Sequence, residues 1–86
     1  MLFHVTVDHT PENCPIVNNA PEKRITTAGA EKAGVKLVLA LGGRAQHRTV
    51  YVVDADDIDK LYDFLNPALS WAKCEIMPVR EYRDDQ

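Results

Sequence analysis

Short runs of apolar residues predict four β-strands. Residues Leu2 to Asp8 alternate strictly between apolar and polar side chains, which is typical of a half-buried strand. The continuous apolar run VKLVLAL and the run HRTVYVVDA predict a β-hairpin, with Gly42 and Gly43 breaking the first strand. The last run, CEIMPV, predicts a short strand at a sheet edge, because Pro78 near its end cannot donate a ladder hydrogen bond.

Two stretches between these runs carry helical signals. The segment NNAPEKRITTAGAEKAGV predicts a helix with Asn19 as its N-cap and Gly34 as its end. In DIDKLYDFL, apolar residues recur at helical spacing, namely at Ile58, Leu61, Tyr62 and Leu65. Asp56 or Asp57 can cap this second helix, and Pro67 is expected to end it.

The resulting order, βαββαβ, predicts an α+β fold of the ferredoxin-like type. Right-handed crossovers place both helices on one face of a four-stranded antiparallel sheet of order 4-1-3-2. We expect one domain over residues 1–86, with a polar tail at 80–86. The strand residues expected to face the helices are Phe3, Val5, Val7, Val50, Val52 and Ile76. Those expected on the uncovered face are His4, Thr6, Asp8, Thr49, Tyr51, Glu75 and Met77.

This uncovered face predicts self-association. A face that mixes Tyr51, Met77 and Val38 with polar groups is too apolar to remain in water. A chain of 86 residues also has only a small core, so pairing with a second copy increases the apolar area that it buries. We therefore expect a homodimer formed through the face that the helices leave open.

Composition and charge exclude several classes of partner. The chain is 45% hydrophobic and 27% charged, with a formal net charge of -3, and its basic residues are scattered. Nucleic acid and anionic membranes are therefore not expected as partners. The start of the chain lacks a signal-peptide pattern, and the longest uncharged apolar run, 37–43, is too short to span a bilayer. We expect a soluble, cytoplasmic protein in which Cys14 and Cys74 are reduced thiols.

The segment GVKLVLALGGRAQHRTVYVVDADDIDKLYDFLNPALSWAKCEIMPV resembles the second half of a family of small, largely uncharacterised proteins in the dimeric α+β barrel superfamily. The motif HTPENCP is similar to the first loop of that family, and the likeness covers residues 2–79. The resemblance implies that two sheets pack face to face around a lumen that often holds a ligand. Superfamily members include monooxygenases acting on activated ring systems, lactone isomerases and haem-degrading enzymes. No complete catalytic signature of these enzymes is present, so no catalytic residue is carried over.

The uncovered face supplies the first group of candidate site residues. Its polar side chains would converge in the lumen of such a barrel: His4, Thr6, Asp8, Thr49, Tyr51 and Glu75. A histidine beside a carboxylate in a partly dry pocket can act as a general base, and a tyrosine can orient a substrate oxygen. The alternative is that these residues only form dimer contacts.

Histidine and cysteine supply the second group. Antiparallel pairing places the end of the first strand beside the starts of the third and fourth, which predicts that His9, Cys14, His47 and Cys74 approach one another. Imidazole and thiolate are the ligands that zinc and copper prefer. The alternative is structural: His9 precedes a Thr-Pro strand exit, and a buried cysteine such as Cys14 behaves as a small apolar residue. The loop GGRAQHR, with two cations, can hold an anionic group or remain a solvated hairpin.

These observations leave three functional hypotheses. The first is a homodimeric α+β barrel that binds a small organic molecule in its lumen without a cofactor, with weak proton-transfer or cofactor-free oxygenase chemistry as an optional activity. The second is a transition-metal-binding module that uses His9, Cys14 and His47 to hold zinc or copper. The third is a structural or regulatory dimer without a ligand. Whether the protein is an enzyme is left open by the sequence.

Overall fold

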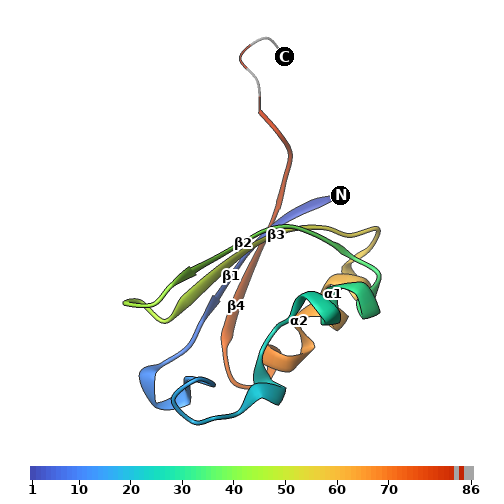
Figure 1. The fold of residues 1–86 in the computed structure, drawn as a ribbon. Coiled ribbons are helices and arrows are strands. Elements are labelled where there is room, and N and C mark those ends of the chain that lie inside the picture. The colour runs from blue at the N-terminus through green and yellow to red at the C-terminus, as the bar shows by residue number, and fades with distance from the viewer. Residues whose placement is uncertain (83, 85–86) are drawn as a thin grey trace.

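The structure, a computed structural model, describes residues 1–82 and residue 84 (Figure 1). Its strands are β1 (Leu2–Asp8), β2 (Lys36–Gly43), β3 (Arg48–Asp54) and β4 (Lys73–Val79). Its helices are α1 (Thr27–Ala33) and α2 (Ile58–Leu69), and two 3₁₀ turns, η1 (Pro11–Asn13) and η2 (Pro21–Lys23), lie between β1 and α1. Among the described residues, no helix has the length and apolar character needed to cross a membrane.

The four strands form one antiparallel sheet in the order β2-β3-β1-β4, which confirms the predicted ferredoxin-like topology. Both helices pack on the same face of the sheet, and the opposite face is left open (Figure 1). The central strand β1 pairs with β3 from Leu2↔Asp54 to Asp8↔Arg48, and with β4 from Leu2↔Val79 to Asp8↔Lys73. Strand β4 is an edge strand, as Pro78 predicted.

The core lies between the sheet and the helices. Its most completely buried large side chains are Val5 and Val53 on the sheet and Leu61, Phe64 and Leu65 on α2. The ring of Tyr51 meets that of Phe64 edge to face, with centroids 5.7 Å apart. Burying each of these side chains contributes about 1.5–3 kcal/mol to stability before entropy is subtracted, so contacts between the sheet and α2 supply much of the fold's stability.

The predicted faces of β3 are wrong by one residue. Val5 lies opposite Tyr51 and Phe3 lies opposite Val53, and residues directly opposite each other share a face. Thr49 and Tyr51 are therefore on the helix side, whereas Val50 and Val52 are on the open face. The sequence misleads here because the run Val50-Tyr51-Val52-Val53 is apolar throughout and has no polar alternation to fix its orientation.

The first helix is shorter than predicted. Helix α1 begins at Thr27, and the Thr26 hydroxyl caps it by accepting a hydrogen bond from the Gly29 backbone N–H at 3.0 Å. Pro21 belongs to the separate turn η2, and Asn19 has a φ of 51°, which is the left-handed conformation and not that of an N-cap. The predicted end at Gly34 is confirmed, because Gly34 has a φ of 77°.

For the second helix, the predicted N-cap is confirmed, whereas the predicted end and part of the predicted buried stripe are wrong. The Asp57 carboxylate accepts a hydrogen bond from the Lys60 backbone N–H at 2.8 Å. Pro67 does not end α2, which continues to Leu69, because Ala68 in this last turn is buried in the core. The buried residues of the helix are Leu61, Phe64, Leu65 and Ala68, while the predicted Ile58 and Tyr62 are 41% and 46% exposed.

Two further predictions concern the glycines at the end of β2 and the polar tail of the chain. Gly42 and Gly43 do not break β2, since both pair with β3, opposite Thr49 and Arg48. The predicted polar tail at 80–86 lies partly outside the described residues. Residues 80–82 and 84 of this tail are described, and they form no helix or strand.

Candidate metal centre

The antiparallel register brings two histidines together at one end of the sheet. His9 directly follows β1 and His47 directly precedes β3, and the last residue of β1, Asp8, pairs with the first residue of β3, Arg48. The backbone N–H of His9 donates a hydrogen bond to the carbonyl of His47 at 3.1 Å. The sheet ladder thus continues by one bond past the strand ends and fixes both histidine backbones.

The loop after β1 returns Cys14 to the same end. Turn η1 closes with a hydrogen bond from the Cys14 backbone N–H to the Pro11 carbonyl at 3.3 Å, and the Asn18 N–H donates to the Cys14 carbonyl at 2.9 Å. The Asn18 side-chain amide also donates to the Glu12 carbonyl at 2.7 Å. These bonds reverse the chain within a few residues. As a result, the thiol of Cys14 is directed inward, with only 6% of the residue exposed.

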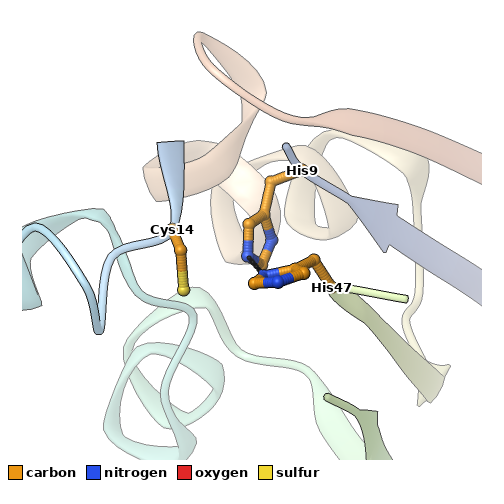
Figure 2. Close-up of side chains that lie close together, drawn as sticks. All are labelled: His9, Cys14 and His47. Carbon is orange, nitrogen blue, oxygen red and sulfur yellow. Dashed lines mark hydrogen bonds between the residues drawn. The ribbon is translucent and has the colours of Figure 1, made fainter. Parts of the chain in front are cut away.

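His9, Cys14 and His47 therefore form one cluster (Figure 2). Their ligand atoms all lie within 4.8 Å of one another, and His9 Nε2 is 3.3 Å from His47 Nδ1. In a tetrahedral zinc site with zinc–nitrogen bonds of about 2.0–2.1 Å, two nitrogen ligands lie about 3.3 Å apart and a sulfur lies about 3.6 Å from each. The nitrogen pair already has this spacing, and an adjustment of about 1 Å in the Cys14 side chain completes the set.

His47 has an unusual backbone conformation. Its φ of 51° is in the left-handed region, at the last position of the four-residue loop between β2 and β3. Its N–H donates to the Arg44 carbonyl at 3.2 Å, which closes the turn. Besides glycine, the residues found most often in this conformation are asparagine, aspartate and histidine. At this position of the turn, His47 Nδ1 lies 3.3 Å from His9 Nε2.

The electrostatic environment favours neutral imidazole at His9. Burial lowers the pKa of His9 below its ordinary value of 6.5, and the neighbouring His47 lowers it further. The His9 ring also lies 5.3 Å from the ring of Trp71, which covers it from the end of α2. Trp71 is itself fixed by a hydrogen bond of 2.7 Å from its indole Nε1 to the Pro67 carbonyl. A neutral, oriented imidazole is the form that binds a metal ion.

The cluster forms part of the wall of a cavity of about 390 Å³. Other parts of the wall are apolar and come from the loop after β1 and from the end of α2, including Ile16, Val17, Ile25 and Trp71. His9, Cys14 and His47 all line the cavity, so a small molecule in it would lie beside the cluster. Three protein ligands with one accessible position are the arrangement that catalytic zinc sites share.

The fourth predicted metal ligand, Cys74, is not part of the cluster. It lies within β4 opposite Val7, is half-buried, and packs against the hydrophobic core. Burial raises the pKa of its thiol, which favours the protonated form. The reason is the sheet register: Cys74 is one residue inside the strand and on its helix side, whereas His9 and His47 lie beyond the strand ends.

The predicted lumen residues divide into two groups. His4, Thr6, Asp8 and Glu75 share the open face, since Thr6 lies opposite Glu75 and His4 opposite Met77. Asp8 accepts hydrogen bonds from Arg48 at 2.6 and 3.3 Å, and Glu75 pairs with Lys73 at 3.1 Å. The placement of Thr49 and Tyr51 on this face is wrong: both line the cavity beside the histidine–cysteine cluster instead.

Sequence reasoning missed Trp71 and Arg24 as residues of the cavity wall. Trp71 carried a usable signal, because it lies just before β4 and so at the same end of the sheet as His9. Arg24 carried none, since its position depends on the irregular path between η2 and α1. No protein-family model matches this chain, and no curated protein matches it significantly. Of the family resemblance, the structure supports the ferredoxin-like topology alone.

Proposed function

We propose that this protein binds a transition-metal ion, zinc or copper, through His9, Cys14 and His47. The convergence of the three ligand atoms within 4.8 Å, from segments far apart in the sequence, carries the proposal. Two imidazoles and one thiolate suit both metals, and carboxylate-preferring ions such as magnesium and calcium are disfavoured. The accessible cavity leaves room for a further ligand on the ion, so the site is suited to binding or activating a small molecule.

Cobalt(II) titration tests the proposal, because cobalt replaces zinc and a thiolate ligand produces an intense charge-transfer absorption in the near ultraviolet. We expect one equivalent to bind to the wild-type protein, and the charge-transfer band to disappear in Cys14→Ser. Cys74→Ser is the matched control and should keep the band, since Cys74 lies outside the cluster.

The histidine variant is best made as His47→Gly. Glycine adopts a φ of 51° without strain, whereas alanine does not, so this variant removes the ligand and preserves the turn. We expect a folded protein with a weakened cobalt site. Equal cobalt binding by the wild type, Cys14→Ser and His47→Gly would contradict the proposed site.

A second candidate function rests on the open sheet face. A row of paired residues crosses the whole sheet there: Leu39, Val52, His4 and Met77. Leu39 is 46% and Met77 is 55% exposed, and Leu41 in the adjacent row is 54% exposed. We propose that a second copy of the chain covers this face, as the resemblance to dimeric α+β barrels implies, and that His4, Thr6, Asp8 and Glu75 line a lumen for a small organic ligand.

Sedimentation velocity tests this second candidate. A homodimer at micromolar concentration is expected, and Met77→Lys should dissociate it by placing charges on an apolar interface. A wild-type chain that sediments as a monomer would exclude both the dimer and its lumen. That result would leave the metal site intact, because all three of its ligands come from one chain.

A further inference from the structure

The charge on the cavity wall differs from that of the chain as a whole. The chain has thirteen acidic and ten basic residues, yet four of the ten basic residues line this one cavity: Lys23, Arg24, Arg44 and Arg48. No aspartate or glutamate is among the described residues that line it. The charged residues of the wall are therefore all basic, on a protein whose formal net charge is -3.

Three of these cations have no ion-pair partner among the described residues. Arg48 pairs with Asp8 at 2.6 Å, but Lys23, Arg24 and Arg44 form no ion pair in the part of the chain that the structure describes. Lys23 and Arg24 come from the segment before α1, and Arg44 comes from the loop between β2 and β3. Residues from two separate segments thus place unpaired positive charge around the same space, which raises the local concentration of anions.

The remainder of the wall restricts the kind of anion. Ile16, Val17 and Ile25 present apolar surface, and the rings of Tyr51 and Trp71 border the same cavity. A fully hydrated inorganic ion makes no use of such surface, whereas an organic molecule with one anionic group uses both parts of the wall. Arginine binds a carboxylate or a phosphate with two parallel hydrogen bonds, so either group suits Arg24 and Arg44.

We propose that the cavity binds a small organic anion, a carboxylate or a phosphate ester, with its apolar part against the isoleucine and valine side chains and its anionic group between the arginines and the metal. The contact between the anionic group and the metal rests on the proposed metal site. Because His9, Cys14 and His47 all line the cavity, a metal ion held by them would border the same space as the arginines, and an anionic oxygen could bind to the ion while arginine neutralised its charge.

Cobalt-loaded protein and three probes test the inference. Hexanoate represents the carboxylates, butyl phosphate the phosphate esters, and hexanamide is a neutral molecule similar in size to hexanoate. Binding is followed by the visible cobalt spectrum, which reports on coordination, and by the fluorescence of Trp71, the single tryptophan in the chain. We expect at least one anion to change both signals, and hexanamide to bind at least about tenfold more weakly. The preferred anion identifies the ligand class.

Arginine variants give the sharper test. The double variant Arg24→Gln/Arg44→Gln should lower anion affinity by about tenfold or more and leave cobalt affinity unchanged. Arg80→Gln is the matched control, because Arg80 is exposed and does not line the cavity. Equal affinity for hexanoate and hexanamide, or no loss in the double variant, would overturn the anion site.

The same titrations on metal-free protein separate the two proposals. Trp71 fluorescence that responds to an anion only after cobalt is added supports both the metal site and the anion site. A second outcome is that the protein binds no cobalt, but the Trp71 fluorescence of the metal-free protein responds to an anion and the double variant loses this response. That outcome would reject the metal site and the metal contact but retain the anion site at the arginines. Cobalt binding with no response to any anion would retain the metal site and reject the anion site.

Discussion

Helices α1 and α2 leave two regions of the sheet uncovered, and these regions differ in shape and chemistry. The open face is a sheet surface on which Leu39, Leu41 and Met77 are exposed beside neutral and paired polar groups. The cavity at the end of the sheet is concave and combines two imidazoles, a buried thiol and three cations that form no ion pair with any described residue. A wide apolar surface suits another protein surface, whereas a small concave site suits a small ligand. We therefore propose self-association through the open face and small-ligand binding at the end of the sheet.

The largest expected effect is on the free energy of unfolding, and it differs between the two faces of β3. Val53 is fully buried on the helix side, and the adjacent Val52 is on the open face, opposite His4. Val53→Lys places an unpaired charge in the core and should cost more than about 4 kcal/mol, enough to unfold a domain of this size. Val52→Lys should cost about 1 kcal/mol or less in the monomer while preventing dimer formation. Urea denaturation and sedimentation measure the two quantities.

The reverse order of stability for these two variants would mean that β3 has the orientation first predicted from the sequence. A Val52→Lys protein that is folded and still dimeric would instead show that the open face is not the dimer interface.

The next largest effect concerns the cavity end. At a free zinc concentration about 100 times the dissociation constant, zinc should stabilise the wild-type protein by about 2.7 kcal/mol. Thermal unfolding should show this increase in the wild type and in Cys74→Ser, and no increase in Cys14→Ser. A similar increase in all three proteins would place the bound zinc elsewhere on the chain.

Acid should weaken this stabilisation, because the two imidazoles must be neutral and the thiol must lose its proton to bind zinc. In the metal-free protein, the lowered pKa of His9 also makes the folded state less stable in acid. As the pH falls below the ordinary value of 6.5, the unfolded chain takes up a proton that folded His9 resists, so stability is lost. Zinc titrations at pH 7 and pH 5.5 should therefore show a lower apparent affinity at pH 5.5.

The topology and the meeting of His9 with His47 were predictable from the sequence for the same reason. Both follow from where the strands begin and end, and β1 was located correctly at both ends, as Leu2 to Asp8. The sequence placed Cys14 at the same end of the sheet but did not give the path of the loop that returns its thiol to the histidines, because Pro11 and Pro15 signal irregular structure without fixing its course.

What the sequence did not predict depends on contacts distant along the chain. In the folded structure Tyr51 packs against Phe64 on the helix side of β3, and no local pattern distinguishes the two orientations of an all-apolar strand. The cavity wall combines Arg24, Arg44 and Trp71 from three segments. Only the folded structure shows that cations scattered in the sequence gather on one surface.

The smallest expected effect concerns Asp8, which lies at the boundary between the two regions. The hydrogen bond from Arg48 holds the pKa of Asp8 below its ordinary value of 3.8. A carboxyl group with a lowered folded-state pKa contributes stability above pH 3.8 and loses it as the pH falls through the lowered value. Asp8→Asn should therefore remove a small part of the acid dependence of unfolding below pH 4, since the pair with Arg48 is partly exposed.

Asp8→Asn should also change anion binding in the cavity, because it removes the negative charge that pairs with Arg48. Without its carboxylate partner, Arg48 becomes a fourth unpaired cation on the wall, so the affinity of the metal-loaded protein for hexanoate or butyl phosphate should rise by about threefold. Asp56→Asn is the matched control, because it removes the same charge from an exposed pair with Lys60, which does not line the cavity. A decrease in anion affinity in Asp8→Asn would show that Asp8 holds Arg48 in a binding position, and that the pair belongs to the cavity and not to the open face.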